Sequence, residues 1–326
     1  MKAVIIDGHG GPEVLKVAEV ETPKPRPGEL LVRVRTSALN RADTLQRMGV
    51  YPPPPGETDL PGLELAGEVE AWGEGVSGFT KGQRVFGLVG GGGYAQYALM
   101  DAGMAMTIPD GWSFQQAAAV PEVYFTANET IFVLGGLQAG ESVLIHAGGS
   151  GVGTAGIQMA HHIGAKVYFT AGSADKIERA MALGADAGIN YKTHDFKDEV
   201  LRLTDGAGVD VVEDFLGASY LERNIAVLKP RGRLVFVGMM GGVKAEFNIG
   251  VVMAKRLQIK GSVMRPLSIE EKRQITRRFQ ERWLPVLVEG KIKPIIDSVF
   301  PMSRVADAHQ AMEDNRNFGK ILLDIE

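Results

Sequence analysis

The stretch VLIHAGGSGVGTAG, Val143–Gly156, constrains the fold of this chain more than any other. An apolar run typical of a strand leads into a glycine-rich turn, and a segment with helical spacing follows. Gly151–Gly156 fits the pattern G-x-G-x-x-G. Such glycines permit a tight turn, a close approach of backbone to a pyrophosphate, and packing of helix on strand. The first N–H groups of the helix then face the phosphates. In this context the pattern predicts a dinucleotide-binding βαβ unit.

Two other glycine-loop chemistries do not fit this stretch. A P-loop requires Gly-Lys-Ser/Thr, but Thr154 directly follows Gly153. A nucleophile elbow requires G-x-S-x-G, and Val152 occupies the position of its last glycine.

Strands and helices alternate every ~10–15 residues around and after this motif, which predicts a doubly wound parallel sheet in an α/β fold. The expected strands are Ser142–His146, Lys166–Thr170, Ala187–Asn190, Val209–Asp214 and Arg233–Gly238. The expected helices are Val152–Ile163, Ala174–Leu183, Phe196–Thr204 and Tyr220–Leu228. We expect Arg233–Gly238 to be the last strand and the open edge of this sheet.

The residues before this region are β-rich, and a short mixed tail follows it. Expected strands are Lys2–Ile6, Leu30–Arg35, Leu63–Ala71, Arg84–Leu88 and Ala95–Met100, followed by helices over Ser113–Ala119 and Glu122–Leu134. In the tail we expect one long helix Ile269–Val288, a strand ending at Val299, a helix Ser303–Glu313 capped by Ser303, and a strand Lys320–Ile325.

This tail is too short to bury a core alone, so we expect it to fold back on the β-rich part. A chain of 326 residues exceeds the usual size of a single core. The predicted domains are therefore a β-rich domain, 1–121 with 267–326, and a dinucleotide-binding domain, 122–266.

Composition narrows the function further. A net charge of −4 provides no basic field for nucleic acid. With no cysteine, disulfides and thiolate metal sites are excluded. The adjacent His161 and His162 point ~100° apart on a helix and cannot share a metal ion, so no metal site is predicted. No apolar run reaches the ~18 residues of a membrane span, and none at the N-terminus resembles a signal peptide. We expect a cytoplasmic protein without a membrane partner.

The end of the second predicted strand indicates which dinucleotide binds. NAD enzymes of this type place an acid there for the ribose 2′-hydroxyl. Here Gly172 and Ser173 occupy the position, and the first carboxylate is Asp175. Ser173 can donate a hydrogen bond, Lys176 can supply positive charge, and Tyr191 can cover the adenine ribose. These features suit a 2′-phosphate and favour NADPH.

A second cluster of polar residues follows the predicted strand Leu30–Arg35. Asn40, Arg41 and Asp43 lie in ALNRAD just beyond that strand, and Tyr51 precedes four prolines. Side chains at such a strand end can converge on a cleft. Asn40 can alternatively be a turn former, and Tyr51 can be a loop anchor.

With these motifs in view, the chain resembles the zinc-free quinone oxidoreductases of the medium-chain dehydrogenase/reductase superfamily, closest to the p53-inducible type. The matching stretches span nearly the whole chain and include SALNRAD, YPPPPG, LPGLELAGEV, GGGYAQYA, LIHAGGSGVGTAGIQ and NFGKILL. The resemblance implies a Rossmann domain and a GroES-like domain. Asn40 then stands where related zinc dehydrogenases carry a cysteine ligand, and Leu63 stands where they carry a histidine.

The resemblance also implies NADPH-dependent reduction of quinones or related enones, and a homodimer joined through the open sheet edge. We expect the nicotinamide in a cleft between the domains. The implied cofactor-binding residues are Thr126, Ser150, Gly151, Val152, Gly153, Gly172, Ser173, Lys176, Tyr191, Val237, Gly238, Ser262 and Asn317.

Hydride transfer to a quinone places negative charge on an oxygen, which needs a stabilising donor in the absence of zinc. The Asn40 amide and the Tyr51 phenol are the candidate catalytic groups. Two other functions stay open at this point: a 2-enoyl thioester reductase built on the same frame, and a low-turnover NADPH-binding structural or sensing protein. The sequence assigns no role to His146.

Overall fold

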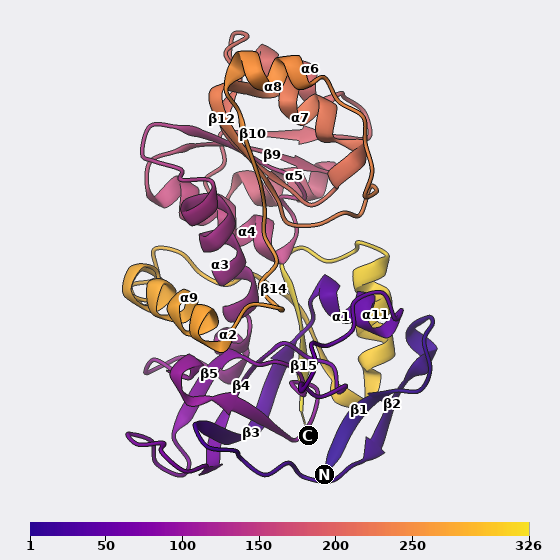
Figure 1. Cartoon of the computed structure of the whole chain (residues 1–326), viewed down its shortest axis with the longest axis vertical. Helices are drawn as coiled ribbons and strands as arrows, with labels where there is room; N and C mark the ends of the chain where they lie inside the picture. Colours follow the sequence, from indigo (N-terminus) through magenta and orange to yellow (C-terminus); the bar gives the residue numbers. More distant parts are fainter. Residues whose placement is uncertain (326) are drawn as a thin grey trace. The chain divides into compact units, whose positions relative to one another are not determined.

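The computed structural model describes residues 1–325. They form two compact units, shown with their helices and strands in Figure 1. The first unit comprises Met1–Phe125, Arg265–Val288 and Pro294–Glu326. The second comprises Thr126–Met264 and Glu289–Lys293.

The second unit is built on a six-stranded parallel sheet in the order β10-β9-β8-β11-β12-β13. This order confirms the doubly wound parallel sheet predicted from the sequence. Its strands are β8 (Ser142–Ile145), β9 (Lys166–Ala171), β10 (Ala187–Asn190), β11 (Val209–Asp214), β12 (Leu228–Phe236) and β13 (Gln258–Gly261). Its helices are α4 (Gly151–His162), α5 (Ala174–Met181), α6 (Phe196–Leu203), α7 (Leu221–Val227) and α8 (Ile249–Lys255).

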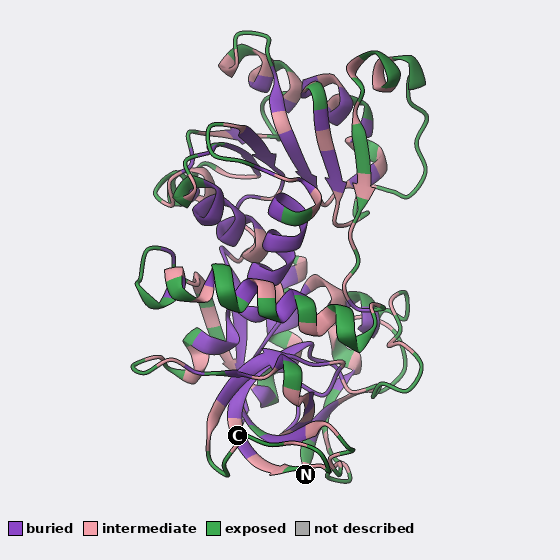
Figure 2. Ribbon diagram, turned by 60° about the vertical axis from the view of Figure 1, so that its left-hand side comes forward, coloured by how far each residue is buried: buried purple, intermediate pink, exposed green. Residues whose placement is uncertain are grey.

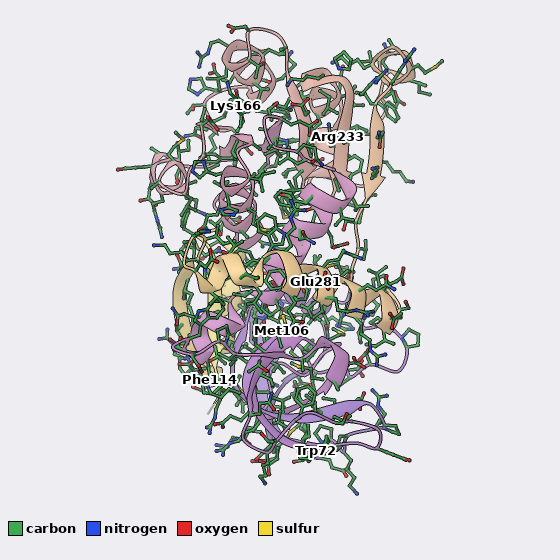
Figure 3. The ribbon with its side chains drawn as sticks, turned by 90° about the vertical axis from the view of Figure 1, so that its left-hand side faces the viewer. Trp72, Met106, Phe114, Lys166, Arg233 and Glu281 are labelled. Atoms are coloured by element: carbon green, nitrogen blue, oxygen red, sulfur yellow. The ribbon has the colours of Figure 1, made fainter. Side chains whose placement is uncertain are left out.

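The predicted edge of this sheet was wrong by one strand. Arg233, labelled in Figure 3, lies in β12 and pairs in register with Gln258 of β13, so β13 forms the edge. The sequence signal for β13 is weak because the strand has four residues and none of them is buried. Figure 2 shows the contrast between buried central strands and more exposed outer segments.

The first unit contains a seven-stranded sheet in the order β14-β15-β3-β4-β5-β7, with β6 also paired to β3. A separate antiparallel pair, β1-β2, accompanies it. The strands are β1 (Lys2–Ile6), β2 (Leu15–Glu19), β3 (Glu29–Ala38), β4 (Glu64–Trp72), β5 (Arg84–Leu88), β6 (Tyr97–Asp101), β7 (Met106–Thr107), β14 (Ile296–Pro301) and β15 (Lys320–Asp324).

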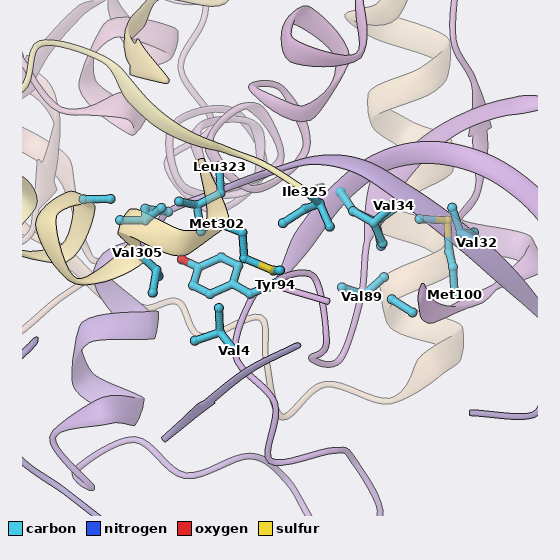
Figure 4. Packing of buried hydrophobic residues seen from close by; sticks show 14 of the residues in the cluster. Val4, Val32, Val34, Val89, Tyr94, Met100, Met302, Val305, Leu323 and Ile325 are labelled. Carbon is cyan, nitrogen blue, oxygen red and sulfur yellow. The ribbon is translucent and has the colours of Figure 1, made fainter. Parts of the chain in front are cut away.

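The C-terminal tail folds back on the β-rich part, as expected. Strand β15 runs antiparallel to β3, with Leu322 opposite Ala38. One apolar cluster joins segments from both ends of the chain: in Figure 4, Tyr94 lies among Val4, Met302 and Val305. Burial of this shared cluster, together with the pairing of β15 with β3, holds the tail to the N-terminal strands.

The helices of the first unit, or shared between the units, are α1 (Arg41–Arg47), α2 (Phe114–Ala118), α3 (Pro121–Ala127), α9 (Ile269–Arg282), α10 (Leu284–Val288) and α11 (Val305–Glu313). The helix expected over Glu122–Leu134 begins as α3 and continues as a π-helical segment, Asn128–Leu134. No helix within residues 1–325 has both the length and the apolar character needed to cross a membrane.

Two predictions in the tail were wrong. The expected single helix Ile269–Val288 is interrupted at Trp283, and Pro285, which has no N–H to donate, lies at the start of α10. Ser303 does not cap α11, because it lies inside a 3-10 turn, Met302–Arg304, and Arg304 takes the cap position. Buried Met302 anchors that turn.

Candidate active site

The glycine turn of the second unit has the geometry of an anion-binding helix N-terminus. Strand β8 ends at Ile145, and α4 begins at Gly151 with Ser150 as its N-cap. The Ser150 hydroxyl accepts the N–H of Gly153 at 3.0 Å. Other N–H groups of the first turn have no partner within the helix, and the helix dipole makes this end positive.

The turn closes only because Gly153 has no side chain. A Cβ at this position would lie 2.4 Å from the carbonyl oxygen of Ala147 and 2.7 Å from Cα of Gly148. Both are backbone atoms that cannot move aside. The geometry of the turn is compatible with the predicted pyrophosphate contact through backbone N–H groups, which stays a prediction.

Most of the predicted cofactor-binding residues follow the carboxyl ends of parallel strands, which share one edge of the sheet. They are Ser150, Gly151, Val152 and Gly153 after β8, Gly172, Ser173 and Lys176 after β9, Tyr191 after β10, Val237 and Gly238 after β12, and Ser262 after β13. Thr126 lies on α3. Asn317 belongs to the first unit, where its amide donates to the carbonyl of Gly319 at 2.8 Å.

At the end of β9, Ser173 caps α5, and its hydroxyl oxygen accepts the N–H of Lys176 at 3.3 Å. The hydroxyl hydrogen stays available to donate, since this contact uses only a lone pair. A Cβ at Gly172 would lie 2.6 Å from the Tyr191 hydroxyl, so glycine lets that ring approach. The nearest carboxylate, Asp175, pairs with Arg179 at 3.7 Å. The edge thus presents hydroxyls rather than an acid.

His146, which had no assigned role, is a neutral packing residue. It is fully buried, with Nδ1 3.0 Å from the Thr170 hydroxyl and Nε2 2.8 Å from the Asn224 side-chain oxygen. Its ring meets those of Phe196 and Tyr220 edge-on. Burial lowers its pKa to about 4.

In the first unit, Asn40 lies directly after β3 and is the N-cap of α1. Its backbone N–H donates to Oδ2 of Asp43 at 2.7 Å. The same carboxylate accepts from the Tyr94 hydroxyl at 3.0 Å and from the N–H of Gly62 at 3.3 Å. Burial raises the pKa of Asp43 to about 6, against the opposing effect of these donors. Asp43 therefore orients the turn that presents Asn40.

The Asn40 side chain is part of a buried network with Lys320 and Glu64. The Lys320 ammonium donates to Oε1 of Glu64 at 2.7 Å, to Oδ1 of Asn40 at 2.7 Å and to the carbonyl of Leu39 at 2.8 Å. The Asn40 amide donates to the same Glu64 oxygen at 2.8 Å. Lys320 is only 3% exposed and Glu64 is fully buried. Each charge is paired and hydrogen-bonded, as burial requires.

This network leaves Asn40 one available donor. Its oxygen is committed to Lys320, and one amide hydrogen is committed to Glu64. The other amide hydrogen faces only the carbonyl of Ala38 at 3.5 Å, which is longer than an ordinary N–H···O bond. Asn40 is thus both a cap of α1 and a partly unsatisfied donor.

Tyr51 lies in a loop held by Arg265. The guanidinium carbon is 5.3 Å from the Tyr51 ring centroid, and Nη1 donates to the Tyr51 carbonyl at 3.1 Å. Nη2 donates to the side chain of Gln46 on α1 at 2.7 Å. Burial and Glu122 raise the pKa of the phenol, and Arg265 opposes them, so the phenol stays protonated near neutral pH. Within the described residues no hydrogen bond joins Asn40 and Tyr51.

Glu122 connects the surroundings of these two residues. Its backbone N–H donates to Oε2 of Glu64 at 2.8 Å. Burial raises the pKa of its carboxyl to about 8, and the charge of Glu64 adds to this effect. Lys320 and Arg265 pull the pKa of Glu122 in the opposite direction. Glu122 therefore lies within the electrostatic reach of both the buried network and Tyr51.

Sequence reasoning missed Glu64, Glu122, Lys320 and Arg265. One signal was available: Lys320 opens an apolar run, KILL, and a lysine in such a run indicates a buried ion pair. The positions of Glu64 and Glu122 had no comparable signal. Among residues 1–325, no group of three or more histidine, aspartate or glutamate side chains is arranged to hold a metal ion.

Comparison with known proteins extends these observations. Residues 26–110 match the family Alcohol dehydrogenase GroES-like domain, and residues 151–281 match the family Zinc-binding dehydrogenase. The quinone oxidoreductase of the rat, Rattus norvegicus, is 34% identical, with 99% of this chain and 97% of that protein covered. The chain belongs to the quinone oxidoreductase family of the medium-chain dehydrogenase/reductase superfamily. The predicted membership of the quinone oxidoreductases in this superfamily, and the Rossmann and GroES-like folds that it implied, are thereby confirmed.

Two solved structures similar to this quinone oxidoreductase family member are described with different nicotinamide cofactors. The Escherichia coli quinone oxidoreductase complexed with NADPH has a TM-score of 0.90 and 29% identity, covering 99% of this chain and 100% of that one. An NAD-dependent alcohol dehydrogenase has a TM-score of 0.89 and 35% identity, with 100% of both chains covered. The chain is an oxidoreductase with a nicotinamide cofactor and a small-molecule substrate.

Proposed function

We propose that this protein reduces quinones with NADPH and without a metal ion. The observation that carries the proposal is the donor set of the first unit. At the two positions where related zinc dehydrogenases bind the metal, this chain has the Asn40 amide and the buried Leu63 side chain. The hydrocarbon of Leu63 offers no ligand atom, and Lys320 already occupies the amide oxygen of Asn40.

The residues of the second unit support NADPH as the preferred cofactor. The α4 turn, Ser150–Gly153, holds the pyrophosphate through backbone N–H groups. Ser173 and Lys176 bind the 2′-phosphate, since Gly172 and Ser173 directly follow β9 in place of an acid and the next carboxylate, Asp175, pairs with Arg179. Tyr191 covers the adenine ribose. We also assign cofactor contacts to a more dispersed set: Thr126, Val237, Gly238, Ser262 and Asn317.

The first unit stabilises the charge that develops on the substrate. Bound NADPH supplies a hydride, and a reduced quinone then carries negative charge on an oxygen. The Tyr51 phenol and the second amide hydrogen of Asn40 donate to that oxygen. Glu64 and Lys320 hold the Asn40 side chain in one orientation, so its donor is already positioned before the reaction.

Steady-state kinetics with the purified protein test the proposal. A panel of quinones, an enone and an enoyl thioester is assayed with NADPH and with NADH, before and after exhaustive chelation. We expect the highest kcat/KM with a quinone and NADPH, and unchanged activity after chelation. Preference for the thioester would favour the 2-enoyl thioester reductase, and NADPH binding without turnover would favour a structural or sensing role. If the protein contained stoichiometric zinc and lost its activity when the zinc was removed, the proposal of a metal-free reaction would be contradicted.

We also propose a homodimer, now assigned to β13 rather than to Arg233–Gly238. An open edge strand is prone to pair with another chain. Large apolar side chains are exposed on and beside this edge, including Met253, Ile259 and Val263. Light scattering at micromolar concentration should give a dimer, and Ile259→Asp should shift it toward monomer. A wild-type monomer would contradict this assignment.

A further inference from the structure

The backbone of Glu122 is fixed beside the buried network of the first unit. Glu122 lies in the first turn of α3, directly after Pro121, whose ring restricts the backbone there. The N–H of Glu122 donates to Oε2 of Glu64, while Lys320 and Asn40 bind Oε1. The start of α3 is therefore tied to the same carboxylate that orients Asn40.

The carboxyl group of Glu122 differs from the other acids of this region. Glu64 and Asp43 are fully buried, and each accepts three hydrogen bonds. Glu122 as a residue is of intermediate exposure although its carboxyl is desolvated by the surrounding protein, and the carboxyl oxygens have no hydrogen bond or ion pair with any residue in 1–325. It is thus the one of these three acids whose oxygens are free to exchange a proton with a bound molecule or with water.

Charged groups from several elements act on this carboxyl. Glu64 on β4 and Asp43 on α1 disfavour its ionisation, while Lys320 on β15 and Arg265 favour it. Lys272 on α9 and the Tyr51 phenol also lie within its electrostatic reach. Desolvation is the largest effect, and the resulting pKa of about 8 keeps most of the population protonated at pH 7. A carboxyl group that is protonated at pH 7 and has a pKa close to that pH can act as a general acid.

Resting on the proposed function, we propose that Glu122 supplies the proton that completes reduction of the substrate, while Tyr51 and Asn40 stabilise the oxygen. A quinone that has accepted the hydride of NADPH is a hydroquinone monoanion. The O–H bond of the Glu122 carboxyl breaks, a new O–H bond forms on the anionic oxygen, and Glu122 becomes a carboxylate. Water then returns a proton to Glu122, so the balance is one quinone, one hydride and one proton to one hydroquinone.

The test compares the wild type with Glu122→Gln, which keeps the shape of the side chain and removes its proton. Glu68→Gln is the matched control, because Glu68 is a partly exposed acid on β4 that pairs with Arg35 outside the network. We measure kcat against pH with a quinone and NADPH. Melting temperature is recorded for each variant.

We expect the wild-type kcat to fall as pH rises through about 8, since the protonated acid is lost there. Glu122→Gln should lower kcat by about 10- to 100-fold at pH 7, at the low end of the ~10²–10⁴-fold range for general acids, and should flatten this pH dependence. Glu68→Gln should keep the wild-type profile. An unchanged profile in folded Glu122→Gln would overturn the proton-donor role.

A second measurement does not depend on turnover. In protein labelled with ¹³C at the glutamate carboxyls, the resonance missing from Glu122→Gln should titrate near pH 8 without substrate. Titration of that resonance in the ordinary range of glutamate would overturn the inference, even if the variant also loses activity. If the wild type turns over no quinone, the proposed function fails. If it turns over quinone but Glu122→Gln behaves like the wild type, only the proton donor fails.

Discussion

The two units prepare their sites in opposite ways. In the second unit the important feature is backbone: the α4 turn offers N–H groups, and Gly153 can close it because no Cβ is present. In the first unit the important feature is charge: Lys320, Glu64 and Asn40 satisfy one another inside the fold. The second unit should therefore be damaged by a substitution that adds atoms to the glycine turn. The first unit should be damaged by a substitution that removes one member of the charge network.

The largest expected effect comes from breaking the charge network. Lys320→Met leaves Glu64 fully buried without its cation, and such a loss typically costs ~3–5 kcal/mol. Urea unfolding should show this drop in the free energy of unfolding. Lys16→Met is the control, because the Lys16–Asp7 pair is exposed to solvent and should contribute little to the free energy of unfolding. Equal, small losses in both variants would show that the network is not what stabilises the first unit.

The next effect comes from adding one methyl group to the backbone-built site. Gly153→Ala places a Cβ against the carbonyl of Ala147, so the turn must open. We expect about 100-fold weaker NADPH binding, or ~2.7 kcal/mol, by fluorescence titration. Gly261→Ala is the control, because nothing lies within 4 Å of a Cβ at that position. Retained NADPH affinity in Gly153→Ala would mean that the phosphates bind elsewhere.

The third test asks whether the polar residues of the first unit affect the rate of the reaction as well as the stability of the fold. A double-mutant cycle combines Asn40→Ala and Tyr51→Phe, with kcat and melting temperature measured for each protein. We expect about a 10-fold loss of kcat for each single change and a non-additive double mutant, because both donate to one oxygen. Small additive losses that follow melting temperature would make both residues structural.

The smallest expected effect sharpens the role of the second unit in cofactor choice. Ser173→Asp should move preference toward NADH, because an acid repels a 2′-phosphate and accepts from a 2′-hydroxyl. The variant should stay folded, since aspartate is also a good N-cap for α5. Ser113→Asp, at the N-cap of α2, is the matched control. A wild type that already prefers NADH would contradict the assignment of Ser173.

Lys176→Ala belongs to the same test. It should cost only ~1 kcal/mol in NADPH affinity if the pair between the Lys176 ammonium and the 2′-phosphate of NADPH is exposed to solvent. The ratio of kcat/KM values for NADPH and NADH measures both changes. A tenfold shift in that ratio corresponds to about 1.4 kcal/mol.

Features carried by local patterns were predictable from the sequence. The strand, glycine turn and helix around α4 involve contiguous residues, and alternation of strands and helices sets the parallel sheet. The missing acid at the end of β9 is equally local. By contrast, β13 is short and exposed, so no periodic pattern marks it, and the cap of α11 depends on a turn anchored by buried Met302.

By itself, therefore, the sequence determined the two folds and the glycine-rich turn before α4, because hydrophobic periodicity and the backbone freedom of glycine act over a few residues. Only the tertiary structure decided the charged site. Lys320 and Glu64 are 256 positions apart, and their pairing depends on β15 folding back beside β3. The open carboxyl of Glu122 likewise follows from burial and from neighbours on other elements. Charge interactions act through space, so residue type and spacing along the chain do not reveal them.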